Sequence, residues 1–359
     1  MTKTLNTALA AAALFSVTAC QGGGAPSGIK LIPEQASVLI SVDVGGLFKT
    51  KAYQDNKALV ESGEAKEMLE AAKACNLDPT TLGTILIGTD AKDPTPNVTA
   101  VITGANIGDE KVLTCISDKA KEKSGEAPFT IADEGGKKIL KMKGDEGVGY
   151  IIDAKTVVIA TKDWAAATKE LIEGKGKSAA DGANKDLFGR ADQKKHIWFA
   201  GILPESALAG LKGSPAEGLK DFSGSLDLTS GLAVNVTVGV ADEAKAKEMK
   251  GQIDMQWPMA KGMAGMFGVP QPVVDSVKFD QSGSSLSVSA SISDADMKAI
   301  QDNAGKMMGG GMGGGGMDGG AGMDGMDHGG GEIAAPPSGE IAPPSGEIAP
   351  PSGEQPAGE

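Results

Sequence analysis

Methionine thioethers and cysteine thiols are the side chains of this sequence best suited to chemistry. The chain has 15 Met and 3 Cys but only 2 His. Around Trp257, four methionines recur at spacings of four, four and three, which places them on one face of a helix. They are Met255, Met259, Met263 and Met266. We expect this face to pack in the core; the alternative is a soft, adaptable surface for an apolar ligand or partner.

A second group of soft ligands lies in residues 306–331, which are mostly glycine. Its thioethers and single imidazole belong to Met307, Met308, Met312, Met317, Met323, Met326 and His328. Thioethers select Cu(I), and glycine spacers would allow several of them to converge on one ion. The alternative is an unstructured linker in which methionine is simply tolerated.

The N-terminus combines a basic start at Lys3 with an apolar run from Ala8 to Val17, which ends in Val17-Thr18-Ala19-Cys20. Ten apolar residues are too few to span a bilayer and match the hydrophobic region of a secretory signal. The segment resembles the signal peptide of bacterial lipoproteins, whose cysteine is acylated and becomes the first mature residue. Val17 stands where that pattern usually has Leu. A plain Ala-x-Ala cleavage site with an incidental cysteine is the alternative.

The lipoprotein resemblance implies that residues 1–19 are removed and that acyl chains on Cys20 hold the protein on a membrane of the bacterial envelope. Multiple acyl chains make such an anchor effectively permanent. Gln21, rather than Asp, follows the cysteine. In the lipoprotein sorting pattern, this implies the outer membrane. Residues 20–32, which include a Gly-rich stretch, are then expected to form a lipidated tether.

With Cys20 assigned to lipid, Cys75 and Cys115 form an even pair in an oxidising compartment. We expect a disulfide between them, because exported proteins retain such bonds. Closing a loop of this length contributes about 3–4 kcal/mol in the chain-entropy model. Two buried thiols that never meet are the alternative, and the lack of a C-x-x-C motif argues against redox catalysis.

Charge and motif content exclude several classes of function. A formal net charge of −13 argues against nucleic acid as a partner. No G-x-S-x-G elbow is present, and His196 heads a strand, where a polar residue needs no catalytic role. Gly174-Lys-Gly-Lys-Ser178 fails as a phosphate loop because the first glycine is missing. We therefore expect no enzyme activity and no cofactor.

The alternation of apolar and polar residues, together with turn-forming residues, indicates the strands and helices that must position the methionines and cysteines. Strands are expected at 37–44, 84–89 and 97–103, and helices at 58–75 and 109–123. Paired strands are expected at 147–152 with 156–161, 222–228 with 232–240, and 274–279 with 284–292. Asp163, Asp242 and either Ser293 or Asp294 follow these pairs as expected helix caps.

Repeated hairpin-plus-helix units predict an α+β fold, with antiparallel strands in one or two sheets and helices on one face. Two halves are expected, at 33–178 and 186–305, split in the polar stretch from Gly174 to Asp186. Residues 332–359 repeat Gly-Glu-Ile-Ala-Pro-Pro-Ser and, with 306–331, are expected to form a disordered tail. Such a Pro-rich tail can reach a protein partner, so the sequence predicts a lipid-anchored binding or structural protein. An apolar-ligand carrier and copper sequestration by the tail are the alternatives.

Overall fold

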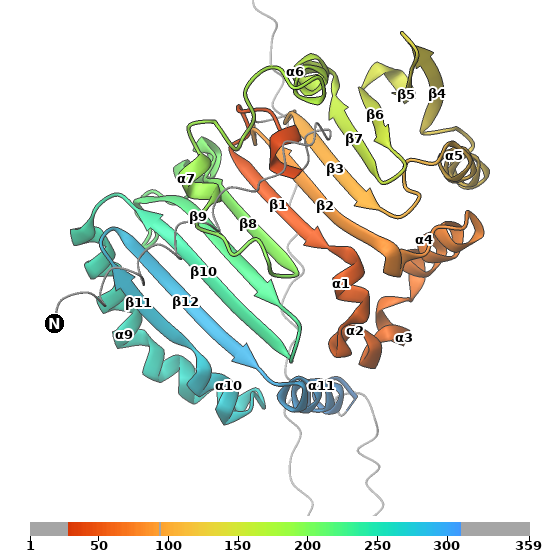
Figure 1. The fold of residues 1–359 in the computed structure, drawn as a ribbon. Coiled ribbons are helices and arrows are strands. Elements are labelled where there is room, and N and C mark those ends of the chain that lie inside the picture. The colour runs from red at the N-terminus through yellow and green to blue at the C-terminus, as the bar shows by residue number, and fades with distance from the viewer. Residues whose placement is uncertain (1–27, 93–94, 310–359) are drawn as a thin grey trace, which may run out of the picture. The chain divides into compact units, whose positions relative to one another are not determined.

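The computed structural model describes residues 28–92 and 95–309, and within them twelve strands form one antiparallel sheet (Figure 1). The order across the sheet is β11-β12-β10-β9-β8-β1-β2-β3-β7-β6-β5-β4. The strands are β1 (Val38–Asp43), β2 (Leu82–Thr89), β3 (Val98–Gly104), β4 (Phe129–Glu134), β5 (Lys137–Met142), β6 (Gly147–Asp153), β7 (Thr156–Thr161), β8 (Ile197–Ile202), β9 (Leu219–Asp227), β10 (Leu232–Val240), β11 (Lys278–Ser282) and β12 (Ser285–Ile292). The predicted α+β class with antiparallel strands is confirmed.

The longer helices connect these strands. They are α4 (Gly63–Ala74), α5 (Glu110–Ser124), α6 (Lys162–Ile172), α9 (Glu243–Met266) and α11 (Asp294–Gly309). Shorter ones are α1 (Val44–Lys49), α2 (Lys51–Asp55), α3 (Lys57–Val60), α7 (Lys185–Phe188), α8 (Glu205–Gly210) and α10 (Gln271–Ser276), with 3-10 turns η1 (Gly28–Leu31), η2 (Pro79–Thr81) and η3 (Lys143–Asp145). The single helix expected at 58–75 is divided into α3 and α4, with Ser62 as the N-cap of α4.

Turn residues between alternating apolar runs correctly located two hairpins. β6 pairs with β7 and β9 with β10, as expected. The third hairpin is shorter than expected, because Val274 lies in α10 and β11 begins only at Lys278. Pro272 near the start of α10 suits a helix N-terminus and lacks the N–H that a strand would need.

Helix capping agrees with the sequence at two of three places. The Asp242 side chain accepts a hydrogen bond from the Lys245 N–H at 2.8 Å, and Ser293 Oγ accepts one from the Asp296 N–H at 3.1 Å. Asp163 does not cap α6: the N-cap is Thr161, and Asp163 lies in the first turn. There the carboxylate still complements the positive end of the helix dipole.

The same order of elements occurs twice along the sheet. Strands β1, β2 and β3 are followed by α5, by the pair β6–β7 and by α6; β8, β9 and β10 are followed by α9, by β11–β12 and by α11. The β4–β5 hairpin is an addition to the first set. The two sets join where β1 pairs antiparallel with β8, from Val38 opposite Gly201 to Val42 opposite Ile197.

Helices lie against both faces of the sheet rather than one. Val158 and Ala160 pack with Trp164 of α6, whereas Val157 packs with Val112 and Leu113 of α5. Consecutive residues of β7 point to opposite faces, so an apolar run such as Val157–Ala160 requires cover on both sides. The expectation of a single covered face was wrong for this reason.

Two segments expected to be linkers contribute to the core. Leu31 and Ile32, which composition placed in the tether, are fully buried. Ala179 and Phe188, within and just after the expected split between halves, are buried in the same cluster. Isolated apolar residues inside polar, glycine-containing stretches give no periodic signal, so the sequence understated how far the folded unit extends.

Candidate apolar binding surface

Helix α9 is fixed to the sheet through its first half and one aromatic contact. Ala246 is fully buried and packs, with Met249, against Val240 and Leu286 of the sheet. Further along, the Trp257 ring lies edge-on to Phe279 of β11, with centroids 5.1 Å apart. These contacts determine which side of α9 faces the strands.

The opposite side of α9 carries the methionines, and they are exposed. Met255, Met259, Met263 and Met266 are between 51% and 80% exposed, and neighbouring Phe267 is 65% exposed. We call these five side chains the Met face. The expectation that the methionines pack in the core was therefore wrong.

The reason is that the C-terminal half of α9 is apolar on two sides. Half-buried Ile253, Trp257 and Ala264 each lie two residues along the chain from one of the methionines. Two residues correspond to a rotation of roughly 200° around a helix, so these side chains lie on the other side of α9. The bulky aromatic ring takes the side against the sheet. What remains outside is a row of flexible thioether side chains, which fit irregular apolar surfaces.

A second open apolar surface lies in the middle of the sheet, between the parts covered by α9 and α5. Ile40 of β1 is opposite Ile87 of β2 and Phe199 of β8, and the two isoleucines are 41% and 36% exposed. The Phe199 and Phe222 rings are 6.1 Å apart. Phe199 lies over Gly224, where an added Cβ would be only 2.6 Å from its Cζ.

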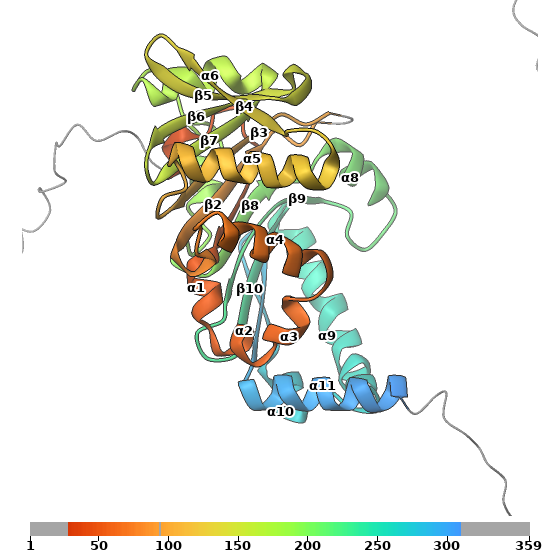
Figure 2. The ribbon, with the colours of Figure 1, turned by 90° about the vertical axis from the view of Figure 1, so that its right-hand side faces the viewer.

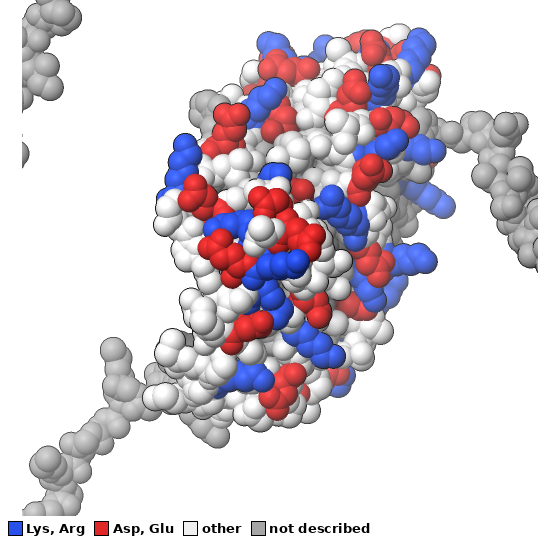
Figure 3. Space-filling model, turned by 90° about the vertical axis from the view of Figure 1, so that its left-hand side faces the viewer, with Lys and Arg blue, Asp and Glu red and all other residues white. Residues whose placement is uncertain are grey.

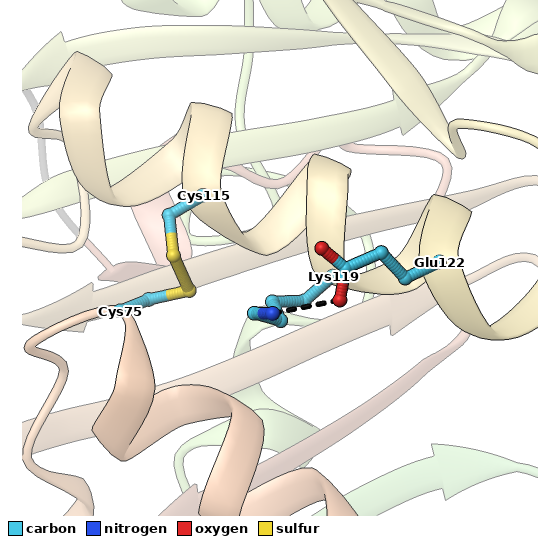
Figure 4. Close-up of a disulfide and its surroundings, with 4 residues drawn as sticks. All are labelled: Cys75, Cys115, Lys119 and Glu122. Atoms are coloured by element: carbon cyan, nitrogen blue, oxygen red, sulfur yellow. Dashed lines mark hydrogen bonds and ion pairs between the residues drawn. A yellow bond between two sulfur atoms is a disulfide. The ribbon is translucent and has the colours of Figure 1, made fainter.

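The two cysteines assigned to a disulfide are joined in the structure, with Cα atoms 5.5 Å apart (Figure 4). The bond links Cys75, the almost fully buried C-cap residue of α4, to Cys115 in α5. Lys119 and Glu122 form an ion pair of 2.7 Å one turn further along α5. The bond thus ties α4, in which no described side chain is buried, to a helix that contributes to the core.

His196 belongs to a hydrogen-bond network that closes the β8–β9 end of the sheet. The Leu228 N–H donates to His196 Nδ1 at 3.1 Å, and Nδ1 lies 3.1 Å from Asp227 Oδ1. Thr229 Oγ1 donates to the same carboxylate oxygen at 2.6 Å, and Lys195 Nζ lies 2.7 Å from Asp227 Oδ2. Because the hydroxyl is bonded to the carboxylate rather than the imidazole, this arrangement does not activate a nucleophile.

Charge on the described surface is mixed. In Figure 3, lysines and arginines alternate with aspartates and glutamates over the face shown. Many such residues of the described chain form ion pairs, for example Lys250 with Asp254 at 2.6 Å. Such a surface offers no continuous basic stripe to a phosphate backbone on that face.

Several residues singled out in the sequence lie outside the described part of the chain. They are Cys20, Met312, Met317, Met323, Met326 and His328, while Met307 and Met308 are described only as helical backbone at the end of α11. Among the described residues, no helix combines the length and the apolar character needed to cross a bilayer. The lipid anchor and the copper site therefore stay predictions from sequence.

Comparison with known proteins gives similarity only at the level of structure. No family model matches the chain, and no curated protein matches it in sequence. Among solved structures, crystal form III of TP0453 aligns with a TM-score of 0.46 and 8% identity, over 77% of this chain and 98% of that one. Crystal form I of TP0453 aligns with a TM-score of 0.44 and 9% identity, over 78% and 97%.

Proposed function

We propose that this chain is a lipid-anchored envelope protein without enzymatic activity, which binds an apolar surface of a partner protein through the Met face. The observation that carries the proposal is the exposure of the five side chains of that face on one helix. Large exposed apolar patches on a folded protein mark sites of interaction. Thioether side chains suit such a site because they repack around different partners.

A protein partner fits this geometry better than an enclosed lipid. The Met face projects outward from a helix and does not line any of the five main cavities of the described part of the chain. A carrier would need its apolar side chains to surround the ligand. A projecting helix face, in contrast, matches the mode in which an amphipathic helix enters an apolar groove of another protein.

Replacing the four methionines by glutamine tests this role. Glutamine keeps the length and helix propensity of methionine but is polar, so we expect the variant to fold and to lose partner capture. A photo-crosslinking residue at exposed Gln256 beside the Met face should yield a discrete crosslinked protein in cells carrying the native sequence, and none with the glutamine variant.

A matched variant with leucine at the same four positions should retain the crosslink, because it keeps the apolar character. An unchanged crosslink in the glutamine variant, or crosslinks confined to lipid, would argue against a protein partner at this face.

The anchor is tested independently. With Cys20→Ala, we expect loss of acylation and of processing at that site, so that a precursor still carrying residues 1–19 accumulates in place of the lipid-anchored mature protein. Mass spectrometry of the mature N-terminus reads the result directly. An unmodified thiol at Cys20 in membrane-associated native protein would contradict the proposal.

The open face around Ile40, Ile87 and Phe199 supports a second candidate function, the binding of an apolar small molecule on the sheet. Organic extraction of the purified protein followed by mass spectrometry should then recover a stoichiometric apolar compound. The Ile40→Gln and Ile87→Gln variants should lose it, while the glutamine variant of the Met face should keep it.

A further inference from the structure

Strands β5 and β6 separate part-way along their length and form a fork in the sheet. They pair only from Ile139 opposite Tyr150 to Lys141 opposite Val148. The same register would next place Lys138 opposite Ile151, and that pair does not form. β4 and β5 remain paired to the end of their hairpin, and β6 and β7 remain paired as far as Asp153 opposite Thr156, with a shift of register between Ile151 and Asp153. The β4–β5 hairpin therefore bends away from β6 as a unit.

A cavity of about 610 Å³ occupies this fork. Residues of both diverging strands line it, with Ile139 and Lys138 on one side and Tyr150 and Ile152 on the other. Ile172 of α6 adds to its apolar wall. The Tyr150 ring is held in place because its hydroxyl donates to the Ala165 carbonyl at 2.8 Å.

The start of α5 closes another side of the cavity. Gly108, just before α5, approaches the Asp153 carbonyl so closely that a Cβ would be 2.0 Å from the oxygen. Glycine is needed there for the backbone to meet the end of β6. The fork is thus a bounded space between two strands.

The charged residues at the rim balance one another. Three lysines and three glutamates line the cavity, at Lys137, Lys138, Lys169, Glu110, Glu134 and Glu173. Lys138 pairs with Glu110 at 2.6 Å, and Lys169 pairs with Glu134 at 3.1 Å. With three charges of each sign, the rim carries no net charge that would select an anion or a cation, so it favours a neutral occupant.

We propose that the fork binds an extended segment of a partner protein, which adds a strand between the diverging parts of β5 and β6. Strand edges are recognised by another main chain through backbone hydrogen bonds, and apolar side chains of the added strand select the sequence through pockets. Here, Ile139, Ile152 and Ile172 form the apolar wall that would take an inward-facing side chain. This site is separate from the Met face and does not depend on it.

Short peptides test the proposal on the whole mature protein. The probes are blocked, fluorescein-labelled peptides of about six residues with Val, Ile, Leu or Phe at alternating positions and Thr between them. We expect at least one to bind at concentrations below about 1 mM. Binding should slow amide hydrogen exchange at residues 137–138 and 151–153, while exchange in α9 stays unchanged.

Matched peptides N-methylated at alternate residues keep every side chain but lose the N–H donors along one edge of the strand. We expect them to bind at least about tenfold more weakly, since strand pairing supplies much of the affinity. The Ile152→Asp variant should also lose binding, and Met259→Gln should retain it. Equal binding of the N-methylated peptides, or no protection of 137–138 and 151–153 with any peptide of the panel, would overturn the proposal.

Discussion

At the scale of single residues, Asp227 is the most strongly perturbed group in the described part of the chain. Hydrogen bonds from Lys195 and Thr229 hold the pKa of its carboxyl well below the usual range. The ordinary value for an unfolded chain is near 3.9, so the folded state binds this proton more weakly than the unfolded state. The network therefore stabilises the fold above pH of about 4, and that contribution is lost as the pH falls further.

The Asp227→Asn variant should be less stable than the native protein at pH 7 by about 1–3 kcal/mol, because three charge-assisted hydrogen bonds, from Lys195 and from the hydroxyl and N–H of Thr229, are weakened. Urea unfolding at pH 7 and at a series of values from about 5 to 2 measures this, and the difference should shrink towards the acid end. Asp280→Asn, at an exposed carboxylate of β11, is the control. A difference that stayed constant across the series would show that ionisation of Asp227 is not its source.

The disulfide provides a second prediction at this scale. Replacing both Cys75 and Cys115 by Ser should lower the free energy of unfolding by about 3–4 kcal/mol, since the bond closes a separation of 40 residues. Native protein treated with a reductant should lose the same amount. Two thiols titratable in unreduced, unfolded protein would contradict the bond.

At the scale of elements, α9 combines an exposed apolar side with residues that weaken a helix. An added Cβ at Gly262 or Gly265 would meet open space. At Gly224, in contrast, an added Cβ would lie only 2.6 Å from the Phe199 ring. The cost of glycine in a helix interior is about 1 kcal/mol relative to alanine.

Gly262→Ala and Gly265→Ala should each stabilise α9 by up to about 1 kcal/mol, visible as slower hydrogen exchange in its C-terminal half. Gly224→Ala should destabilise the protein, because the methyl group has to displace Phe199. If the two helix variants left exchange in α9 unchanged, helix propensity would not limit its local stability.

Elements with regular alternation and clear turn residues could be predicted from sequence, as β6–β7 and β9–β10 show. The β4–β5 hairpin was missed although its turn, Gly135-Gly136, carries the positive φ values that such turns need. The exposed side of α9 could not be predicted, because Trp257 and the methionines give apolar residues on two sides of one helix. The fork between β5 and β6 depends on the residue at which pairing between these two strands ends. The alternation of apolar and polar residues does not indicate that residue.

At the scale of the folded unit, the central strand pair joins the two sets of elements. β1 and β8 pair with each other, and the main core takes Leu39 and Val101 from one set and Trp198 and Ala200 from the other. This main core therefore spans both sets, although each set also has a smaller buried cluster of its own. Stability should therefore belong to the whole of residues 28–309.

Calorimetry should show one unfolding transition, with van't Hoff and calorimetric enthalpies in agreement. A protease site placed at exposed Lys175 should allow cleavage without separation of the fragments on a sizing column. Two transitions, or fragments that elute apart, would show that the sets fold as separate domains.

The β1–β8 pairing has an evolutionary consequence. Its register is symmetric about Ile40 and Phe199, and each partner begins a set with the same topology. Two identical half-length chains joined edge to edge would form the same seam, as in a twofold homodimer. The seam would then need no residue outside the two copies, and the β4–β5 hairpin, which opens the fork, is present in the first set and has no counterpart among the described residues of the second.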